Sequence, residues 1–404
     1  MQKHTEGTKT FSGPARNGGG GLESAVIARY RDGAAEVEPA LCCPTAGYDP
    51  RYLDIIPQEI LDKDYGCGDP SQYVKEGEVV LDLGSGGGKI CYILAQKTGP
   101  EGRVIGLDFN DAMLDLARKY EDQVADGLGY RNFAFHKARI QDMALDLDAA
   151  NAWLRENPIH DIDGMTRYNE YCGWLRREKP LVESDSVDVI VSNCVLNLVQ
   201  TGEKEQLFFE MFRVLRRGGR AVISDIVCDE DPTPEILHDP HLWSGCIAGA
   251  FREDDFLKRF ENAGFHGVEI LSRSEKPWQT IDGIEFRSMT VQAFKGKQGP
   301  CFDCNQAVVY KGPWKQVRDD DGHVYHRGQR MAVCEKTYRL LTDPAGPYAG
   351  HMIGVEPLQE VAPEDAKLFD CAAGAMRHPR QTKGQDYRAT ETNTDPDCSD
   401  GACC

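Results

Sequence analysis

The chain has 404 residues, of which 41% are hydrophobic and 27% charged, a balance typical of a globular protein with two or three domains. Its formal net charge of −19 would repel phosphate backbones and anionic lipid surfaces, so we expect no nucleic-acid partner and no membrane partner. There is no apolar run long enough to span a bilayer and no secretory leader pattern, which favours a cytoplasmic location.

The chain contains fifteen cysteines, an odd number that is high for a compartment in which thiols stay reduced. Any one of them is more simply interpreted as a small buried hydrophobic side chain. As a set, however, they indicate reactive or metal-binding thiols.

The N-terminal part, residues 1–70, predicts a flexible, cysteine-bearing segment rather than a domain. Residues 1–24 include the glycine run Gly18–Gly21 and are expected to be flexible. Two short helices are expected, from Ser24 to Glu38 and from Asp49 to Leu61, with Cys42 and Cys43 between them.

Residues 71–295 alternate between strand and helix patterns. Strands are expected at 78–83, 103–107, 132–136, 187–192 and 220–225, and helices at 90–96, 111–124 and 203–217. Gly218 and Gly219 would end the last helix. This alternation predicts an α/β domain with a doubly wound, mostly parallel sheet that is covered on both faces.

Two further segments complete the predicted organisation. Residues 141–184 separate the third and fourth strands and predict a helical insertion, with an amphipathic stretch at 145–156. From residue 296 to 404 the pattern changes to a smaller α+β domain, with strand-like pieces at 307–310 and 323–327. Its polar tail, 381–404, is expected to be disordered.

A glycine-rich turn follows the first predicted strand, where a strand passes into a helix. Gly84, Ser85 and Gly86 allow a ligand to approach the backbone closely and meet the free N–H groups of the helix start. Asp82, just before the turn, suits a cationic ligand better than the pyrophosphate of a dinucleotide. A nicotinamide-binding domain or a simple packed turn remains the alternative interpretation.

Residues at the ends of the next two strands refine the prediction. Asp108 is placed to accept hydrogen bonds from ribose hydroxyls, and Ile140 and Gln141 to border an adenine. Met113 would pack on the adenine or belong to the core. Together with the glycine turn, these features resemble the class I methyltransferases, which implies S-adenosylmethionine as cofactor and a Rossmann-like fold.

Three cysteine motifs fall within or beside this domain: YGCG at 65–68, VSNCVLNL at 191–198 and WSGCIAGA at 243–250. They resemble the motifs of the arsenite S-adenosylmethionine methyltransferases. The resemblance covers about Cys42 to Phe294, and the Gly401–Cys404 end adds a weak sign of the same kind.

The resemblance implies that Cys67, Cys194 and Cys246 bind arsenic(III), and that Cys43, or its neighbour Cys42, is a fourth functional thiol. This thiol would form a disulfide with Cys67 and would be restored by glutathione or thioredoxin. The implied substrates are arsenite and then methylarsenite, with no required metal cofactor and with arsenic detoxification as the role.

The chemistry of arsenic agrees with this assignment. Arsenic(III) is a soft centre that prefers thiolates, and three thiolates leave it one lone pair to attack a methyl group. Tyr65 and Asn193, which flank two of the thiols, are interpreted either as lining the methyl-transfer path and the cofactor or as packing and turn residues.

Two other functions remain open from the sequence, a methyltransferase for another small-molecule acceptor and a non-enzymatic thiol protein that binds soft metals. A structural zinc site is a further possibility in the C-terminal domain. Cys301 and Cys304 have the spacing of half such a site, which Cys334, His323 and His326 would complete.

Overall fold

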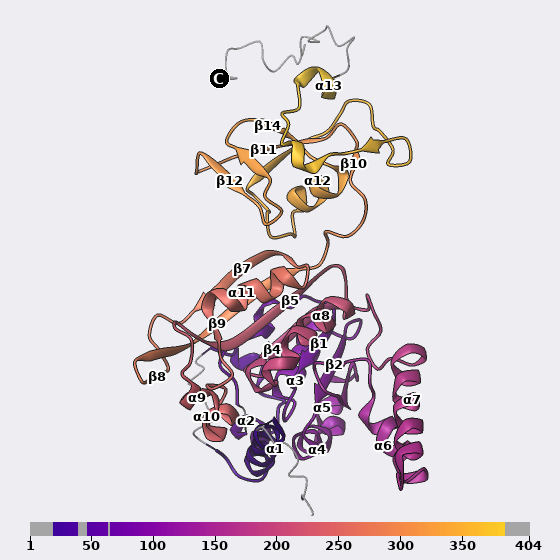
Figure 1. Ribbon diagram of the computed structural model, residues 1–404, viewed down its shortest axis with the longest axis vertical. Helices are drawn as coiled ribbons and strands as arrows, with labels where there is room; N and C mark the ends of the chain where they lie inside the picture. The colour runs from indigo at the N-terminus through magenta and orange to yellow at the C-terminus, as the bar shows by residue number, and fades with distance from the viewer. Residues whose placement is uncertain (1–18, 39–46, 64, 384–404) are drawn as a thin grey trace, which may run out of the picture. The chain divides into compact units, whose positions relative to one another are not determined.

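The computed structural model describes residues 19–38, 47–63 and 65–383 and divides into two compact units, residues 1–296 and 297–404 (Figure 1). Within the described residues, no helix has both the length and the apolar character needed to cross a bilayer.

The first unit contains a nine-stranded sheet with the order β3-β2-β1-β4-β5-β9-β7, in which β6 pairs with β5 and β8 with β9. β1 to β5 are parallel, whereas β9 runs antiparallel to β5, β7 and β8. The predicted doubly wound, mostly parallel sheet is therefore confirmed. The strands are β1 (Val79–Leu83), β2 (Arg103–Asp108), β3 (Phe133–Lys137), β4 (Val187–Asn193), β5 (Leu215–Cys228), β6 (Phe251–Arg252), β7 (His266–Arg273), β8 (Gln279–Ile281) and β9 (Ile284–Phe294).

Helices cover both faces of this sheet. Because successive side chains of a strand point to opposite faces, each strand contributes side chains to two separate cores. In β1, Val80 packs in the cluster that includes α3 (Lys89–Thr98) and α4 (Asp111–Lys119). Its neighbour Leu81 packs with α8 (Lys204–Val214) and α11 (Glu253–Asn262). The near-continuous apolar runs of the parallel strands follow from this double cover.

The residues between β3 and β4 form two helices, α6 (Leu147–Glu156) and α7 (Ile162–Glu178). They pack on each other through stacked rings, Trp153 against Tyr171 with a centroid distance of 5.3 Å. The predicted single helix over 111–124 is wrong, because the chain breaks at Tyr120 into α4 and α5 (Glu121–Leu128).

The predicted helix over 203–217 is wrong at its C-terminal end. α8 ends at Val214 and β5 begins at the next residue, so Gly218 and Gly219 belong to a strand. They lie where the pairing of β4 with β5 shifts register, and a Cβ on Gly219 would lie 2.9 Å from the Asp188 carbonyl oxygen. These glycines thus permit an irregular strand rather than end a helix.

The N-terminal elements also differ from expectation. α1 spans Gly19–Ala35, so residues 19–24 form the start of a helix, while residues 1–18 lie outside the described part. The helix expected over 49–61 is two short pieces, η2 (Pro50–Tyr52) and α2 (Gln58–Asp62), because Pro57 cannot continue a helix from the residues before it.

The described residues of the first unit also contain five short helical elements. They are η3 (Pro70–Tyr73), η4 (Leu196–Leu198), η5 (Thr201–Glu203), α9 (Pro234–Leu237) and α10 (Pro240–Ser244).

The described residues of the second unit form small antiparallel sheets and two α-helices, and their core includes Val308, Tyr310 and Tyr325. The predicted small C-terminal α+β domain is thus confirmed. Residues 381–383 end α13 and are not part of a disordered tail; residues 384–404 lie outside the described part. The elements are β10 (Phe302–Asp303), β11 (Ala307–Tyr310), β12 (Gln316–Arg318), β13 (Val324–His326), β14 (Arg330–Ala332), α12 (Glu335–Thr342), β15 (Met352–Val355), β16 (Lys367–Leu368), η6 (Cys371–Ala373) and α13 (Pro379–Lys383).

Candidate functional site

A cavity opens at the carboxyl ends of β1, β2 and β4, where the turn from β1 to α3 forms one wall. Gly84 and Gly86 have positive φ angles of 67° and 52°, which a side chain would strain. A Cβ on Gly84 would lie 2.5 Å from a methyl carbon of Val195, whereas one on Gly86 would enter open space. The hydroxyl of Ser85 is buried and has no hydrogen-bond partner among the described residues. The turn therefore presents a backbone cradle and an unused polar group to a ligand.

Two carboxylates stand at this cradle. Asp82 is 2% exposed and accepts a hydrogen bond of 3.1 Å from the thiol of Cys91. Asp108 accepts hydrogen bonds of 2.8 Å from the backbone N–H groups of Gly86 and Asn110. Burial raises the pKa of Asp108, and the backbone N–H groups partly offset that rise. The wall thus concentrates negative charge, which suits a cationic ligand.

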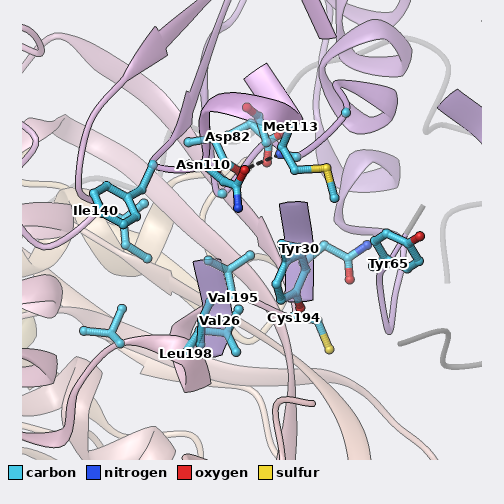
Figure 2. A pocket seen from close by; sticks show the side chains of 18 of the residues that line it. Val26, Tyr30, Tyr65, Asp82, Asn110, Met113, Ile140, Cys194, Val195 and Leu198 are labelled. Atoms are coloured by element: carbon cyan, nitrogen blue, oxygen red, sulfur yellow. Dashed lines mark hydrogen bonds between the residues drawn. The ribbon is translucent and has the colours of Figure 1, made fainter. Parts of the chain in front are cut away.

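Other residues predicted for the cofactor line the same cavity. Met113, Ile140 and Gln141 belong to its wall, and Figure 2 shows Asp82, Met113 and Ile140 on the side opposite Cys194. Gln141 donates a hydrogen bond of 2.9 Å to Glu203. The carboxylates, the cradle and the apolar wall together fit S-adenosylmethionine.

Cys194 is the predicted arsenic ligand that lines this cavity. It follows β4 directly, and its N–H donates a hydrogen bond of 2.8 Å to the carbonyl of Ser224 on β5. Its φ is +64°, a backbone conformation that non-glycine residues adopt at a cost and that is concentrated at functional sites. The side chain is 6% exposed.

Cys67 lies on a segment that rests on the ends of β4 and β5. The Asn193 side-chain oxygen accepts hydrogen bonds of 2.8 and 3.0 Å from the N–H groups of Cys67 and Gly68, and its amide donates 2.8 Å to the Gly68 carbonyl. A Cβ on Gly66 would overlap the Asn193 amide, and one on Gly68 would lie 2.7 Å from the Ser224 hydroxyl. The glycines on either side of Cys67 are therefore required by close contact.

Cys246 follows α10 and also has a left-handed backbone, with φ of +63°. The Asn197 amide donates a hydrogen bond of 3.0 Å to its carbonyl. Its thiol donates a hydrogen bond of 3.0 Å to the carbonyl of Cys194, and its sulfur lies 3.9 Å from the hydroxyl oxygen of Tyr30. Cys194 and Cys246 thus meet directly.

The three predicted arsenic ligands lie in one buried cluster, each less than 7% exposed. Their sulfur atoms are nevertheless not assembled, since the described residues contain one group of three metal-ligand atoms within 4.8 Å of one another, and it is elsewhere. The sequence therefore predicted that the three cysteines lie in one region, but it did not predict how far apart their sulfur atoms are. Cys42 and Cys43 lie outside the described residues.

The sequence allowed two interpretations of Asn193 and Tyr65, as cavity-lining residues or as packing residues. Both side chains line the cavity, and both also form hydrogen bonds with backbone groups. Asn193 fastens the Cys67 segment, as described above. The Tyr65 hydroxyl donates a hydrogen bond of 2.9 Å to the Gly33 carbonyl and accepts one of 3.0 Å from the Glu38 N–H. Both residues therefore join the thiol segment to its surroundings.

Sequence reasoning missed α1 as a wall of the site. Glu23, Val26, Ile27 and Tyr30 line the cavity, and Figure 2 shows Tyr30 and Val26 beside Cys194. Burial raises the pKa of the Tyr30 hydroxyl, with the neighbouring Cys246 and Cys194 adding to the rise, so this hydroxyl is neutral. There is no motif at 19–35 that could have indicated this role.

α1 also bridges the two sides of the cavity. On the cofactor side, the Asn110 amide donates a hydrogen bond of 3.0 Å to the Ile27 carbonyl. On the thiol side, the Arg29 guanidinium donates a hydrogen bond of 3.0 Å to the His241 carbonyl and another of 3.2 Å to the Ser244 hydroxyl.

Two buried titratable side chains, Asp225 and Lys204, lie on the thiol side. Asp225 is fully buried and accepts hydrogen bonds of 2.8 Å from the N–H groups of Leu196 and Ile226. Burial raises its pKa to about 6, and burial lowers the pKa of nearby Lys204 to about 8. Asp225 thereby fixes the turn that follows Cys194.

The predicted zinc ligands of the second unit do not come together as expected. Cys301 lies with Cys334 and with Cys371, which the sequence had not singled out, and neither Cys304 nor a histidine belongs to this described group. His323 instead pairs with Asp319, with its Nδ1 2.8 Å from a carboxylate oxygen.

Two family models match the chain. Residues 74–169 and 174–264 match a methyltransferase domain, and residues 297–387 match a domain of unknown function.

Similar proteins cover most of the chain. It is 29% identical to the arsenite methyltransferase of Aquipseudomonas alcaligenes over 77% of this chain and 84% of the relative. It is 28% identical to the arsenite methyltransferase of Homo sapiens over 76% of each. A crystal structure of an arsenic(III) S-adenosylmethionine methyltransferase from Chlamydomonas reinhardtii matches with a TM-score of 0.51 and 27% identity, over 82% of this chain and 99% of that one. The class I methyltransferase fold and the resemblance predicted from the motifs are both confirmed.

Proposed function

We infer that this chain, an enzyme homologous to the arsenite methyltransferases, transfers methyl groups from S-adenosylmethionine to trivalent arsenic, first in arsenite and then in methylarsenite. One observation carries the inference. The thiol-bearing residue Cys194 lines the same cavity as the glycine cradle, Asp82 and Asp108, and it touches Cys246 within a buried cluster that also includes Cys67.

In this proposal the cavity walls hold the two reactants in line. S-adenosylmethionine supplies, when bound, an electrophilic methyl group on a sulfonium. Asp108 and the free hydroxyl of Ser85 bind its polar parts, and Asp82 offsets its positive charge. The remaining task of the protein is to hold the attacking atom about 3–3.5 Å from the methyl group and in line with the bond that breaks.

The thiols of Cys67, Cys194 and Cys246 would hold arsenic. Arsenite, As(OH)3, exchanges its three hydroxyls for three thiolate ligands, and the protons of the three thiols leave with the hydroxyls as three waters. One lone pair remains on arsenic as the nucleophile. Because the Cys246 thiol donates to the Cys194 carbonyl, it has to turn away from that carbonyl to bind arsenic. Methylarsenite, with one methyl group already present, needs only two thiolates.

Methylation raises arsenic formally to the pentavalent state, so two electrons have to be returned before another methyl group is added. A dithiol that becomes a disulfide supplies two electrons. We assign this role to Cys67 with Cys43 or Cys42, restored by glutathione or thioredoxin. We place this reaction in the reducing cytoplasm, where it would serve arsenic detoxification.

The test is an assay with labelled S-adenosylmethionine, arsenite and a thiol reductant, with methylated arsenic as the readout. Cys194→Ser should lower the rate at least about 100-fold, because the lone pair loses its alignment. Cofactor affinity should stay close to that of the unmodified chain.

The matched control is Cys228→Ser. Cys228 lies in the same buried cluster, but burial raises the pKa of its thiol to about 12, and nothing assigns it a role. This control should methylate arsenite at a rate close to that of the unmodified chain. Full activity in Cys194→Ser would overturn the proposal.

A further inference from the structure

We propose that the second unit contains a separate binding site for trivalent arsenic, formed by Cys301, Cys334 and Cys371. The three sulfur atoms lie within 4.8 Å of one another, and no other group of three possible metal ligands among the described residues is this compact. This inference goes beyond methyl transfer and does not require it.

Long-range pairing brings the three cysteines together. β10 pairs antiparallel with β16, and the N–H of Phe369 donates a hydrogen bond of 2.9 Å to the Cys301 carbonyl. Cys371, at the start of η6, follows two residues later. Cys334 arrives from another direction as the N-cap of α12, where its sulfur accepts a hydrogen bond of 3.4 Å from the Thr337 N–H.

The surroundings suit thiolates. The N-terminus of α12 carries partial positive charge toward the Cys334 sulfur, and the ammonium of Lys336 donates a hydrogen bond of 3.0 Å to the Gly299 carbonyl, two residues before Cys301. Cys334 is fully buried, whereas Cys301 and Cys371 are partly exposed and line a cavity. A small neutral molecule such as As(OH)3 can reach the sulfur atoms from that side.

The number of ligands favours arsenic over zinc. Structural zinc takes four ligands in a tetrahedron, and no histidine or carboxylate of the described residues joins these three sulfurs within 4.8 Å. Arsenic(III) needs three, with its lone pair in the fourth direction. Binding exchanges three As–OH bonds for three As–S bonds, the three thiol protons leave with the hydroxyls as three waters, and no electron is transferred.

The first experiment measures thiol protection in the full, reduced chain. The protein is alkylated with and without arsenite, and each cysteine-containing peptide is quantified by mass spectrometry. Arsenite should slow alkylation of Cys301 and Cys371 at least tenfold and leave Cys304 unchanged. Cys304 is the matched control, because it is the other cysteine of the Cys301-x-x-Cys304 motif and stands outside the cluster. Equal alkylation of Cys301 with and without arsenite would overturn the proposal.

The second experiment counts arsenic bound per chain by equilibrium dialysis against arsenite. Cys301→Ser should bind one arsenic fewer than the unmodified chain, Cys304→Ser should lose none, and Cys301→Ser should still methylate arsenite. An unchanged count in Cys301→Ser would overturn the site. So would purified protein that carries zinc on these cysteines and does not exchange it for arsenite.

Discussion

The two thiol sets of this chain are arranged in opposite ways. In the first unit, Cys67, Cys194 and Cys246 share a buried cluster, but their sulfur atoms are not gathered to binding distance. In the second unit, Cys301, Cys334 and Cys371 are gathered and face a cavity. Cys194 of the first set lines the cavity that contains Asp82 and Asp108, whereas the second set faces a different cavity.

The backbone reinforces this contrast. Cys194 and Cys246 both have positive φ angles, at a cost of order 1–3 kcal/mol each, whereas no cysteine of the second set does. A storage site needs only proximity of its ligands, but a methyl-transfer site also has to aim a lone pair. In the proposed reaction, the strained backbone of Cys194 and Cys246 would serve this aim.

The largest expected effect tests whether only the first set depends on the cofactor. Asp108→Ala should weaken S-adenosylmethionine binding about 10- to 100-fold, because the carboxylate is lost together with its charged hydrogen bonds. Arsenite methylation at limiting cofactor should fall in proportion, and arsenic bound per chain should not change. Isothermal titration and equilibrium dialysis measure the two quantities.

Asp111→Ala is the control for that variant, since Asp111 lies three residues away with an exposed side chain paired to Lys137. Unchanged cofactor affinity in Asp108→Ala would show that Asp108 does not bind the cofactor. It would also weaken the conclusion that only the first thiol set depends on the cofactor.

An intermediate effect is expected where close backbone contact positions Cys67. Gly66→Ala would place a methyl group on the Asn193 amide and push the Cys67 segment away, so methylation of arsenite should fall about tenfold. Arsenite protection of Cys301 from alkylation should stay unchanged. Gly202→Ala, which meets nothing within 4 Å, should leave both measurements unaltered. Equal rates for Gly66→Ala and Gly202→Ala would show that this contact does not matter.

The smallest effect concerns the buried Asp225 beneath the Cys194 turn. Its pKa is about 6 in the folded chain against an ordinary 3.8, so between those values the folded state keeps a proton that the unfolded state has released. This contribution to stability is complete below pH 3.8 and is lost as the pH rises through 6. The unfolding free energy of the first unit should therefore fall over this window, and less so in Asp225→Asn.

Urea unfolding followed by labelling of Cys194 and Cys334 reports the two units separately. The difference between the unmodified chain and Asp225→Asn should depend on pH at Cys194 and not at Cys334. A difference that is constant from pH 4 to 6 at Cys194 would contradict the raised pKa of Asp225.

Much of the first unit followed from the sequence because its signals are local. Alternating strand and helix patterns gave the parallel core, and parallel strands bring their carboxyl ends to one edge, which placed Asp82, Asp108 and Cys194 at one cavity. Gly218 and Gly219 misled because glycines that end a helix and glycines that relieve a crowded strand have the same sequence pattern.

What the sequence could not supply depends on distant contacts. Cys301 and Cys304 looked like a pair because they are neighbours in sequence, yet pairing of β10 with β16 brings Cys371 to Cys301 instead. The amide of Asn193 reaches back across 126 positions to the N–H of Cys67. The positive φ angles of Cys194 and Cys246 likewise have no sequence signature.

The bridging position of α1 links events that would otherwise be separate. One helix is fastened to Asn110 beside the cofactor wall and to His241 and Ser244 beside the thiols. The same helix carries Tyr30, whose hydroxyl lies 3.9 Å from the Cys246 sulfur, so any displacement of α1 would alter the cofactor wall and the surroundings of this thiol together. In the proposed reaction, the cofactor wall and the thiols would therefore be coupled through one helix.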